Sequence, residues 1–161
     1  MINPDSFRDA MRAWATGIAV ITAQTPIERH GMTVNSFTSV SLNPPLGLVC
    51  IQNNLRILSL IRSAGAFAIS VLRADQSEWS QHFATPSTEV LDRLAGYETF
   101  TAATGMPILK GALGYFDCQV EAYHSGGTHT IIVAHVLDAK REEGEPLVYW
   151  NRDYRILAVA S

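Results

Sequence analysis

The hydrophobic pattern at the start of the chain predicts a helix whose apolar side faces a core. Phe7, Met11 and Trp14 recur at helical spacing and form one stripe, which we expect to pack against the rest of the domain. Ser6 is a candidate N-cap for this helix, and Gly17 is expected to end it.

Apolar runs rich in β-branched residues predict buried strands through the first half of the chain. Three such runs occupy residues 18–23, 46–52 and 67–72. The stretch 33–40 predicts a further strand, although Ser, Thr and Asn are frequent in it. The apolar residues within 57–61 have helical spacing, and the Ser-Ala-Gly that closes this segment is typical of a helix C-terminus.

A third helix and an irregular segment are expected in the middle of the chain. A capping pattern that begins at Asp75 predicts a helix carrying Trp79 and Phe83. Residues 84–112 are interrupted by proline and glycine, so they predict an irregular excursion with one short helix at 90–94.

The last third of the chain is rich in predicted strands. Within 115–124, four apolar residues alternate with three polar ones, which indicates a strand with one wet face; these are Phe116, Cys118, Val120 and Ala122 against Asp117, Gln119 and Glu121. A second strand at 129–139 follows a Ser-Gly-Gly turn, and two short strands follow at 146–150 and 154–157. About seven strands with short connections and three or four helices predict one mainly β domain over residues 1–161, an antiparallel barrel with peripheral helices.

Composition narrows the class of protein. The 161 residues are 47% hydrophobic and 17% charged, which is ordinary for a globular domain. The formal charge of −3, without a Lys/Arg cluster, argues against nucleic-acid binding. The dense charges of 139–145 are mixed in sign and indicate a solvated turn.

We expect a cytoplasmic protein without a membrane segment. No stretch approaches the ~20 apolar residues of a membrane span, and the first residues lack the basic-then-apolar pattern of a signal peptide. Cys50 and Cys118 lie in apolar or alternating segments, so we expect reduced cysteines rather than a disulfide or a metal site.

Several common catalytic motifs are absent. The chain has no glycine-rich dinucleotide or P-loop fingerprint, no H-E-x-x-H, no C-x-x-C and no G-x-S-x-G. His129 and His135 share one face of their predicted strand, but no third candidate ligand lies at a spacing typical of a metal site. No metal site is therefore predicted.

The hydroxyl-rich stretch has two interpretations. From composition alone, residues 33–41 are a half-exposed strand in which Ser and Thr tolerate water. Alternatively, small polar side chains beside Gly31 let a flat ligand approach the backbone, whose N–H and C=O groups then contact its edge. A second segment where a ligand could approach the backbone precedes His129, because Gly126 and Gly127 permit a sharp turn there.

These residues carry a resemblance to a known family. The stretch "GMTVNSFTSVSLNPPLGLVC" resembles the flavin-binding segment of the short-chain flavin reductases, the reductase components of two-component flavin-dependent monooxygenases. Four further blocks resemble the family in order and spacing: "FRDAMRAWATGIAVITA", "SAGAFAISVLRADQSEWSQHFA", "GGTHTIIVAHV" and "PLVYWNRDYRIL". The resemblance covers nearly the whole chain.

The resemblance implies both a fold and an activity. The fold would be a homodimeric FMN-binding split barrel. The activity would be reduction of FMN or FAD by NADH or NADPH, with reduced flavin supplied to a partner monooxygenase. Because the flavin carries the redox chemistry, no catalytic side chain is required. Two alternatives remain: a split barrel that binds flavin without turnover, as a carrier or sensor, and a dimeric barrel without a ligand.

The resemblance also implies the residues of the site. The isoalloxazine would lie along Thr33, Val34, Asn35 and Ser36, largely through main-chain groups. The ribityl–phosphate side would be lined by Ser39 and Ser41. The opposite wall would be formed by Cys50, Ile51 and Gln52, and the closing segment by Phe83 and Ala84. The nicotinamide would lie near His129, with Tyr154 at its rim.

One segment departs from the family pattern. After the second wall strand the family commonly has Lys or Arg followed by Ser and Ser/Thr, whereas this chain reads "QNNLRILSL". Asn53 and Asn54 can donate hydrogen bonds to a phosphate there, and Arg56 can supply a positive charge. The choice between FMN and FAD, and between NADH and NADPH, stays open.

Overall fold

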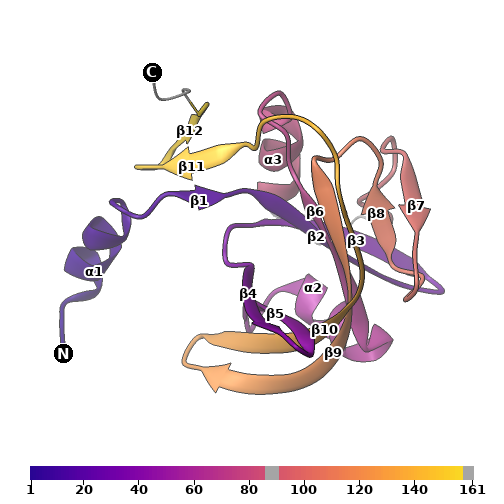
Figure 1. Ribbon diagram of the computed structural model, residues 1–161. Coiled ribbons are helices and arrows are strands. Elements are labelled where there is room, and N and C mark those ends of the chain that lie inside the picture. The colour runs from indigo at the N-terminus through magenta and orange to yellow at the C-terminus, as the bar shows by residue number, and fades with distance from the viewer. Residues whose placement is uncertain (86–90, 158–161) are drawn as a thin grey trace.

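The computed structural model describes residues 1–85 and 91–157 (Figure 1). This part of the chain contains three helices, α1 (Pro4–Met11), α2 (Arg56–Ala64) and α3 (Ser77–Ala84). Its strands are β1 (Thr16–Gly17), β2 (Ala19–Thr25), β3 (Glu28–Val34), β4 (Thr38–Leu42), β5 (Pro45–Gln52), β6 (Ala66–Val71), β7 (Thr99–Thr101), β8 (Pro107–Leu109), β9 (Gly114–Gly126), β10 (His129–Arg141), β11 (Val148–Trp150) and β12 (Asp153–Arg155).

Seven strands form one antiparallel sheet in the order β3-β2-β6-β9-β10-β5-β4. Its edge strands β3 and β4 are not paired with each other, so the barrel stays open, and α2 lies between β2 and the β4–β5 hairpin (Figure 1). β9 and β10 form a long hairpin whose turn includes Gly127 at φ +69°, a conformation that glycine adopts without steric cost. The predicted mainly β, antiparallel split-barrel fold is confirmed.

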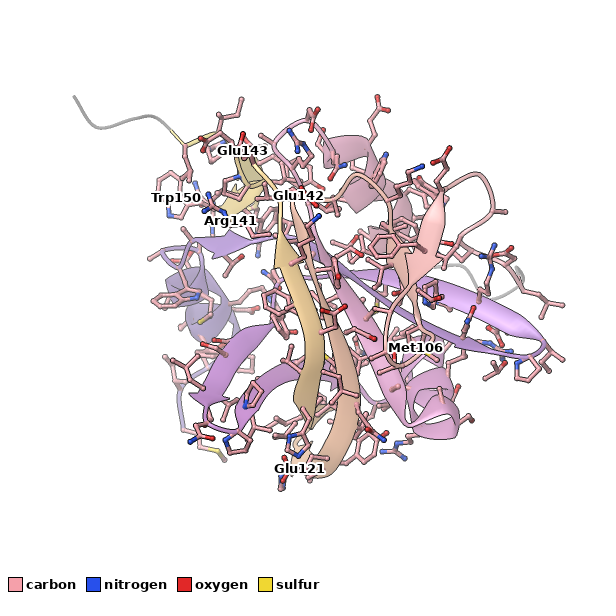
Figure 2. All side chains as sticks on the ribbon, turned by 45° about the vertical axis from the view of Figure 1, so that its right-hand side comes forward. Met106, Glu121, Arg141, Glu142, Glu143 and Trp150 are labelled. Carbon is pink, nitrogen blue, oxygen red and sulfur yellow. The ribbon has the colours of Figure 1, made fainter. Side chains whose placement is uncertain are left out.

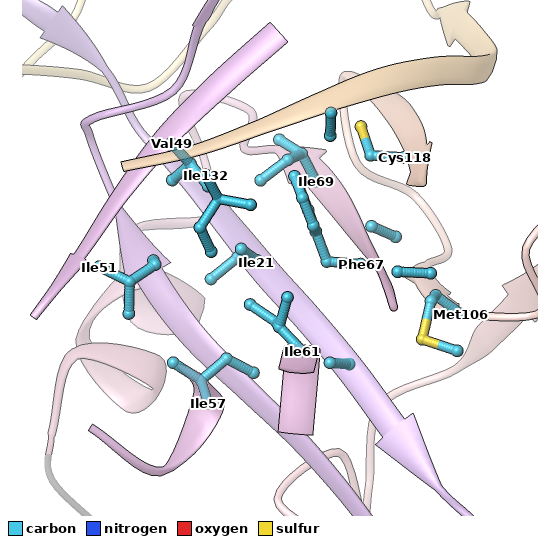
Figure 3. Packing of buried hydrophobic residues seen from close by; sticks show 14 of the residues in the cluster. Ile21, Val49, Ile51, Ile57, Ile61, Phe67, Ile69, Met106, Cys118 and Ile132 are labelled. Atoms are coloured by element: carbon cyan, nitrogen blue, oxygen red, sulfur yellow. The ribbon is translucent and has the colours of Figure 1, made fainter. Parts of the chain in front are cut away.

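The main core lies between the sheet and α2. Ile57 and Ile61, one helical turn apart on α2, are fully buried against Ile21 of β2 and Phe67 of β6 (Figure 3). Burying each such side chain contributes about 1.5–3 kcal/mol to the stability of the fold, so this face of α2 holds the helix firmly against the open side of the barrel. The helix ends where Gly65 adopts φ +66°, as the Ser-Ala-Gly signal predicts.

A smaller apolar cluster holds α3 and the last hairpin against the other side of the sheet. Phe83 of α3 is buried in it together with Val20 of β2 and Leu147, which precedes β11. Tyr149 and Tyr154 of the β11–β12 hairpin pack against its edge. This cluster fixes the C-terminal end of α3 beside β3.

The expectation for the first helix is wrong, because α1 ends at Met11 rather than at Gly17, which lies in β1, and Trp14 lies beyond the helix. Phe7, Met11 and Trp14 are 57%, 48% and 68% exposed, and α1 projects away from the sheet (Figure 1). The N-cap is Asn3, whose side chain accepts a hydrogen bond from the N–H of residue 5, and not Ser6. An amphipathic stripe indicates that a face is suited to burial, but it does not say which surface covers it.

Two details of the middle of the chain also differ from expectation. The α3 N-cap is Gln76, without a side-chain capping bond, rather than the pattern begun by Asp75. Residues 91–94 form a bridge and turn instead of the predicted short helix, whose first residue lies outside the described part, and a small β7–β8 hairpin follows. Short hairpins between glycines and prolines leave little periodic signal.

In the alternating strand β9, one residue predicted to lie on the solvent-exposed face is buried. Asp117 is fully buried, where its carboxylate accepts hydrogen bonds from the N–H and hydroxyl of Thr104. Gln119 and Glu121 are exposed as expected. The β7–β8 excursion covers the start of β9, so a nominally wet position becomes internal.

Three further features of the described residues concern the charged turn, the cysteines and the length of the helices. The charged residues 139–145 are exposed, and Figure 2 shows Glu142 and Glu143 just past the end of β10. Cys50 and Cys118 are free cysteines. None of the three described helices combines the length and apolar character that a membrane span requires.

Candidate functional site

The hydroxyl-rich stretch is not one continuous strand. β3 ends at Val34 and β4 begins at Thr38, and residues 35–37 leave the sheet between them. Within the described residues, the backbone N–H and C=O groups of 35–37 make no backbone hydrogen bond. Open backbone donors and acceptors of this kind suit the polar edge of a flat ligand.

Ser36 ties this open segment to the facing strand. Its hydroxyl donates to the carbonyl of Cys50 at 3.0 Å and accepts from the Cys50 N–H at 3.2 Å. Phe37 is fixed beside it by Phe116, with ring centroids 4.9 Å apart, and by Gly47, where a Cβ would come within 3.0 Å of the Phe37 ring. The two predicted walls, 33–36 and 50–52, are therefore brought together. The Cys50 N–H and C=O are used by Ser36, and the main chain of residues 35 and 36 stays outside the strand ladders.

α3 packs on β3, the strand that leads into the open segment. Thr33 Oγ1 donates to the carbonyl of Ser80 at 2.7 Å, and the Tyr154 hydroxyl donates to Ser80 Oγ at 2.9 Å. Phe83 packs directly over Gly31, where a Cβ would lie 2.8 Å from the ring. Ser80 was not predicted, because a single serine in a short helix carries no sequence signal.

The other predicted cofactor residues are distributed around this segment. Val34 and Ile51 are buried in the main core, so their side chains are not exposed to a ligand. Ser39 and Ser41 lie on the edge strand β4, separated by a register shift, and Ser41 Oγ accepts a local hydrogen bond from the N–H of residue 43. Ala84 is exposed at the end of α3.

The segment after β5 is engaged with the β9–β10 turn. Asn53 donates from its backbone N–H to the carbonyl of Thr128 at 3.0 Å and from Nδ2 to the carbonyl of Gly127 at 3.2 Å. Its Oδ1 accepts from the hydroxyl of Thr130 at 2.8 Å. Asn54 is exposed, and the structure gives its side chain no hydrogen bond. The Asn53 amide therefore stabilises a turn and is not open to a phosphate.

Arg56 is also committed elsewhere, contrary to expectation. It forms a two-pronged ion pair with Glu28, with Nε to Oε1 at 2.7 Å and Nη2 to Oε2 at 2.5 Å. The hydrogen bond from Arg56 holds the pKa of the buried Glu28 carboxyl below its ordinary value. The segment after β5 therefore supplies no free cation for a flavin phosphate.

The two predicted nicotinamide residues lie at separate places in one chain. His129 stands opposite Gln52 in the β5–β10 ladder and lines a cavity of about 290 Å³ with Arg62 and Tyr123. Tyr154 contacts Ser80 at α3, and no contact among the described residues joins it to His129. Within one chain these two residues lie on different elements, and their role at the nicotinamide stays a prediction.

A larger cavity adjoins the open segment. It has a volume of about 830 Å³ and lies between α1, β1, residues 35–38 and the β11–β12 turn. Its lining includes the side chains Trp14, Asn35 and Tyr149 and three arginines, Arg8, Arg12 and Arg152. The three arginines were not among the predicted site residues, because they are distant in sequence and follow no motif.

The structure offers no set of side chains for nucleophilic or metal chemistry in its described part. No group of three His, Cys, Asp or Glu side chains gathers there in a way that could hold a metal ion. Burial, and secondarily the charge of Asp117, raises the pKa of Cys118 to about 12, so that thiol is inert at neutral pH. The arrangement is suited to binding and orienting a cofactor.

Comparison with known proteins identifies the family. Residues 11–158 match the flavin reductase like domain family. The chain belongs to this family. It is 38% identical over 159 residues to an NADH-dependent flavin reductase of Rhodococcus sp, covering 97% of this chain and 88% of the relative. It is 36% identical to the reductase component of 4-hydroxyphenylacetate 3-monooxygenase of Thermus thermophilus, covering 95% of this chain and 96% of the relative.

A solved structure agrees with the fold. The NADH:FAD oxidoreductase SgcE6 of Streptomyces globisporus superposes with a TM-score of 0.91 at 31% identity, covering 98% of this chain and 97% of that one. The predicted flavin reductase family and the assignment to the oxidoreductases that use flavin and a nicotinamide donor are confirmed.

Proposed function

We propose that this chain transfers hydride from NADH to FMN or FAD and releases reduced flavin to a partner monooxygenase. The observation that carries the proposal is the unpaired backbone of residues 35–37, held open between the Cys50 wall and α3. The family membership supports it, as do relatives described as an NADH-dependent flavin reductase and a monooxygenase reductase component.

The residues of the chain bind and orient rather than react. A bound flavin supplies the hydride-accepting chemistry that no side chain of the site provides. The backbone of residues 35–37 would hold the polar edge of the ring, and Gln52 and Ala84, which the resemblance implies, would line the same site. Hydride transfer requires the donor carbon about 3–3.5 Å from the acceptor with the two rings stacked, so positioning is the main task of the protein.

The working unit is a homodimer, and two observations support this part of the proposal. Phe7 and Met11 of α1, and Trp14 just beyond the helix, form an apolar stripe that its own chain leaves exposed. His129 and Tyr154 are separate within one chain, so a second copy is needed to bring both to one nicotinamide. Burial of an exposed apolar stripe of this kind is a usual driving force for self-association.

The proposal also includes the cellular compartment and the number of domains. The two free cysteines, Cys50 and Cys118, are consistent with a reducing environment, and we place the protein in the cytoplasm as a single domain.

A second candidate is a split barrel that binds flavin without turnover. It is favoured by the segment after β5, where Asn53 and Arg56 are committed to other partners. Flavin binding without any oxidation of NADH, by a folded protein, would select it.

His129→Ala tests the nicotinamide role. The KM for NADH should rise about several-fold, the value of one positioned hydrogen bond, while the dissociation constant of the flavin stays nearly unchanged. His124→Ala is the matched control, because His124 lines the same cavity from β9. Equal losses in both constants for His129→Ala, or equal effects of the two variants, would remove His129 from the nicotinamide site.

A further inference from the structure

The positive charge that could bind the phosphate of a nucleotide substrate is not supplied by the segment after β5. A nucleotide substrate brings at least one phosphate, which proteins usually hold with guanidinium groups or free N–H donors. The segment after β5 has no free guanidinium, since Arg56 pairs with Glu28, and the Asn53 amide bonds the β9–β10 turn, which leaves the neutral Asn54 amide as an uncommitted side-chain donor. The charge for a phosphate has to come from elsewhere.

The β11–β12 turn presents an arginine in an unusual conformation. Asn151 and Arg152 form its two central residues with φ of 51° and 63°, which is the geometry of a type I′ turn. Glycine is favoured at the second central position because an L side chain is strained there. Residues in such sparsely populated conformations cluster at binding and active sites, so Arg152 is a candidate for a binding role.

The same turn is tied to α1. Arg12 Nε donates to Asn151 Oδ1 at 2.8 Å, which holds the end of the first helical segment against the turn. Arg12 Nη1 lies 3.3 Å from Asp9, and Arg8 Nη1 lies 2.7 Å from Asp5, so both arginines have local carboxylates. In the described part of the chain, Arg152 makes no ion pair.

Arg152 therefore lines a cavity without a counter-ion. The cavity of about 830 Å³ also includes the side chains of Asn35, Ser36 and Thr38, next to the backbone that is open to a flat ring. A nucleotide whose ring lies on residues 35–37 can extend its phosphate into this space. The hydroxyl of Thr38 and the amide of Asn35 are further polar groups of the same lining.

We propose that Arg152, with Arg12 beside it, forms a phosphate-binding site for one of the two nucleotide substrates in the cavity between α1 and the β11–β12 turn. The inference rests on the proposed function, because that function names the nucleotides. The phosphate belongs either to the flavin or to the dinucleotide donor, and the two sources are separated by experiment.

Arg152→Gly is the decisive variant, because glycine fits the positive φ and the turn is retained. Binding is measured by isothermal titration calorimetry with FMN, with riboflavin, which lacks the phosphate, and with ADP-ribose, which lacks the nicotinamide. If the flavin phosphate binds here, FMN weakens about tenfold and riboflavin is unchanged; if the donor phosphate binds here, only ADP-ribose weakens, by a similar factor. Raising the salt concentration should weaken binding to the wild type more than to Arg152→Gly.

Controls keep the test specific. Arg141→Gln removes an exposed arginine that does not line this cavity, and it should leave all three dissociation constants unchanged. Thermal unfolding of Arg152→Gly at or above the wild-type temperature shows that the turn is intact. Unchanged binding of all three ligands, or equal weakening of FMN and riboflavin, overturns the inference. The proposed function is judged separately, by NADH oxidation of the wild-type protein.

Discussion

The hydroxyl of Tyr154 donates a 2.9 Å hydrogen bond to the buried hydroxyl of Ser80. Because the Ser80 carbonyl also accepts from Thr33, one residue of α3 links the last β-hairpin to the strand that borders the open segment. In the proposed reductase, Ser80 is a positioning residue that holds the Tyr154 ring at the nicotinamide rim.

Ser80→Ala and Tyr154→Phe each remove that bond and retain an aromatic ring at position 154, which is then no longer held by the bond. Each should raise the KM for NADH several-fold, as expected for the loss of about 1 kcal/mol, with little change in flavin affinity. The double variant should be no worse than either single variant, because both remove the same interaction. Steady-state kinetics of the three variants checks this, and additive losses would show that the two side chains act independently.

Gly31 is required by the close approach of Phe83. A Cβ at Gly31 would lie 2.8 Å from the ring, and Leu94 closes the space behind it at 3.1 Å. Gly31→Ala should therefore lower the free energy of unfolding by about 1–3 kcal/mol and weaken flavin binding by displacing α3. Gly17→Ala is the control, since nothing lies within 4 Å of its Cβ position. Urea unfolding of both variants gives the comparison, and equal stabilities would contradict the packing argument.

The ion pair between Glu28 and Arg56 predicts a pH dependence of stability. The Glu28 side chain is only 5% exposed, and the hydrogen bond from Arg56 lowers its folded-state pKa. A lowered folded-state pKa gives stability that is fully present above the unfolded value of about 4.3 and is lost as pH falls through the folded value. Arg56→Gln should therefore be less stable than the wild type at neutral pH, with a difference that shrinks in acid.

Urea unfolding between neutral pH and about pH 3 measures this difference. Lys110→Gln is a suitable control, because it breaks an ion pair with Glu98 whose two side chains are both exposed. A gap between wild type and Arg56→Gln that stays constant across the acid range would show that Glu28 does not carry the effect.

Features of the fold that depend on local pattern could be predicted from the sequence. α2 combines helical spacing with a glycine C-cap, and β9 and β10 combine alternation with a Gly-Gly turn, so local signals and tertiary packing agree there. α1 was recognised as an amphipathic helix, but its stripe is exposed in one chain, because periodicity does not specify the covering surface.

The placement of the candidate site residues could be predicted only where it follows the main chain, and their roles in binding stay predictions. The segment 33–36 and the wall at Cys50 are adjacent as the resemblance implies. The engagement of Asn53 with the β9–β10 turn, the pairing of Arg56 with Glu28 and the role of Ser80 depend on contacts between distant segments. Such contacts leave no pattern in a single sequence.

The exposed apolar stripe, formed by Phe7 and Met11 of α1 and by Trp14 just beyond the helix, predicts that the chain self-associates. Trp14→Gln should shift the proposed homodimer toward monomer, because it removes the most exposed of the three large apolar side chains of the stripe. Ile27→Gln is the matched control, since Ile27 is 81% exposed in the β2–β3 turn and belongs to no such stripe. Light scattering after size exclusion measures the masses. A wild-type monomer, or a Trp14 variant that remains dimeric at all concentrations, would contradict the proposed interface.

The central claim is that this chain passes hydride from NADH to a flavin held by the open backbone of residues 35–37. The direct measurement is the loss of NADH absorbance with the purified protein and FMN, FAD or no flavin added. We predict oxidation that depends on flavin and saturates with its concentration. Absence of NADH oxidation in every combination, by a folded protein that still binds flavin, would contradict the claim.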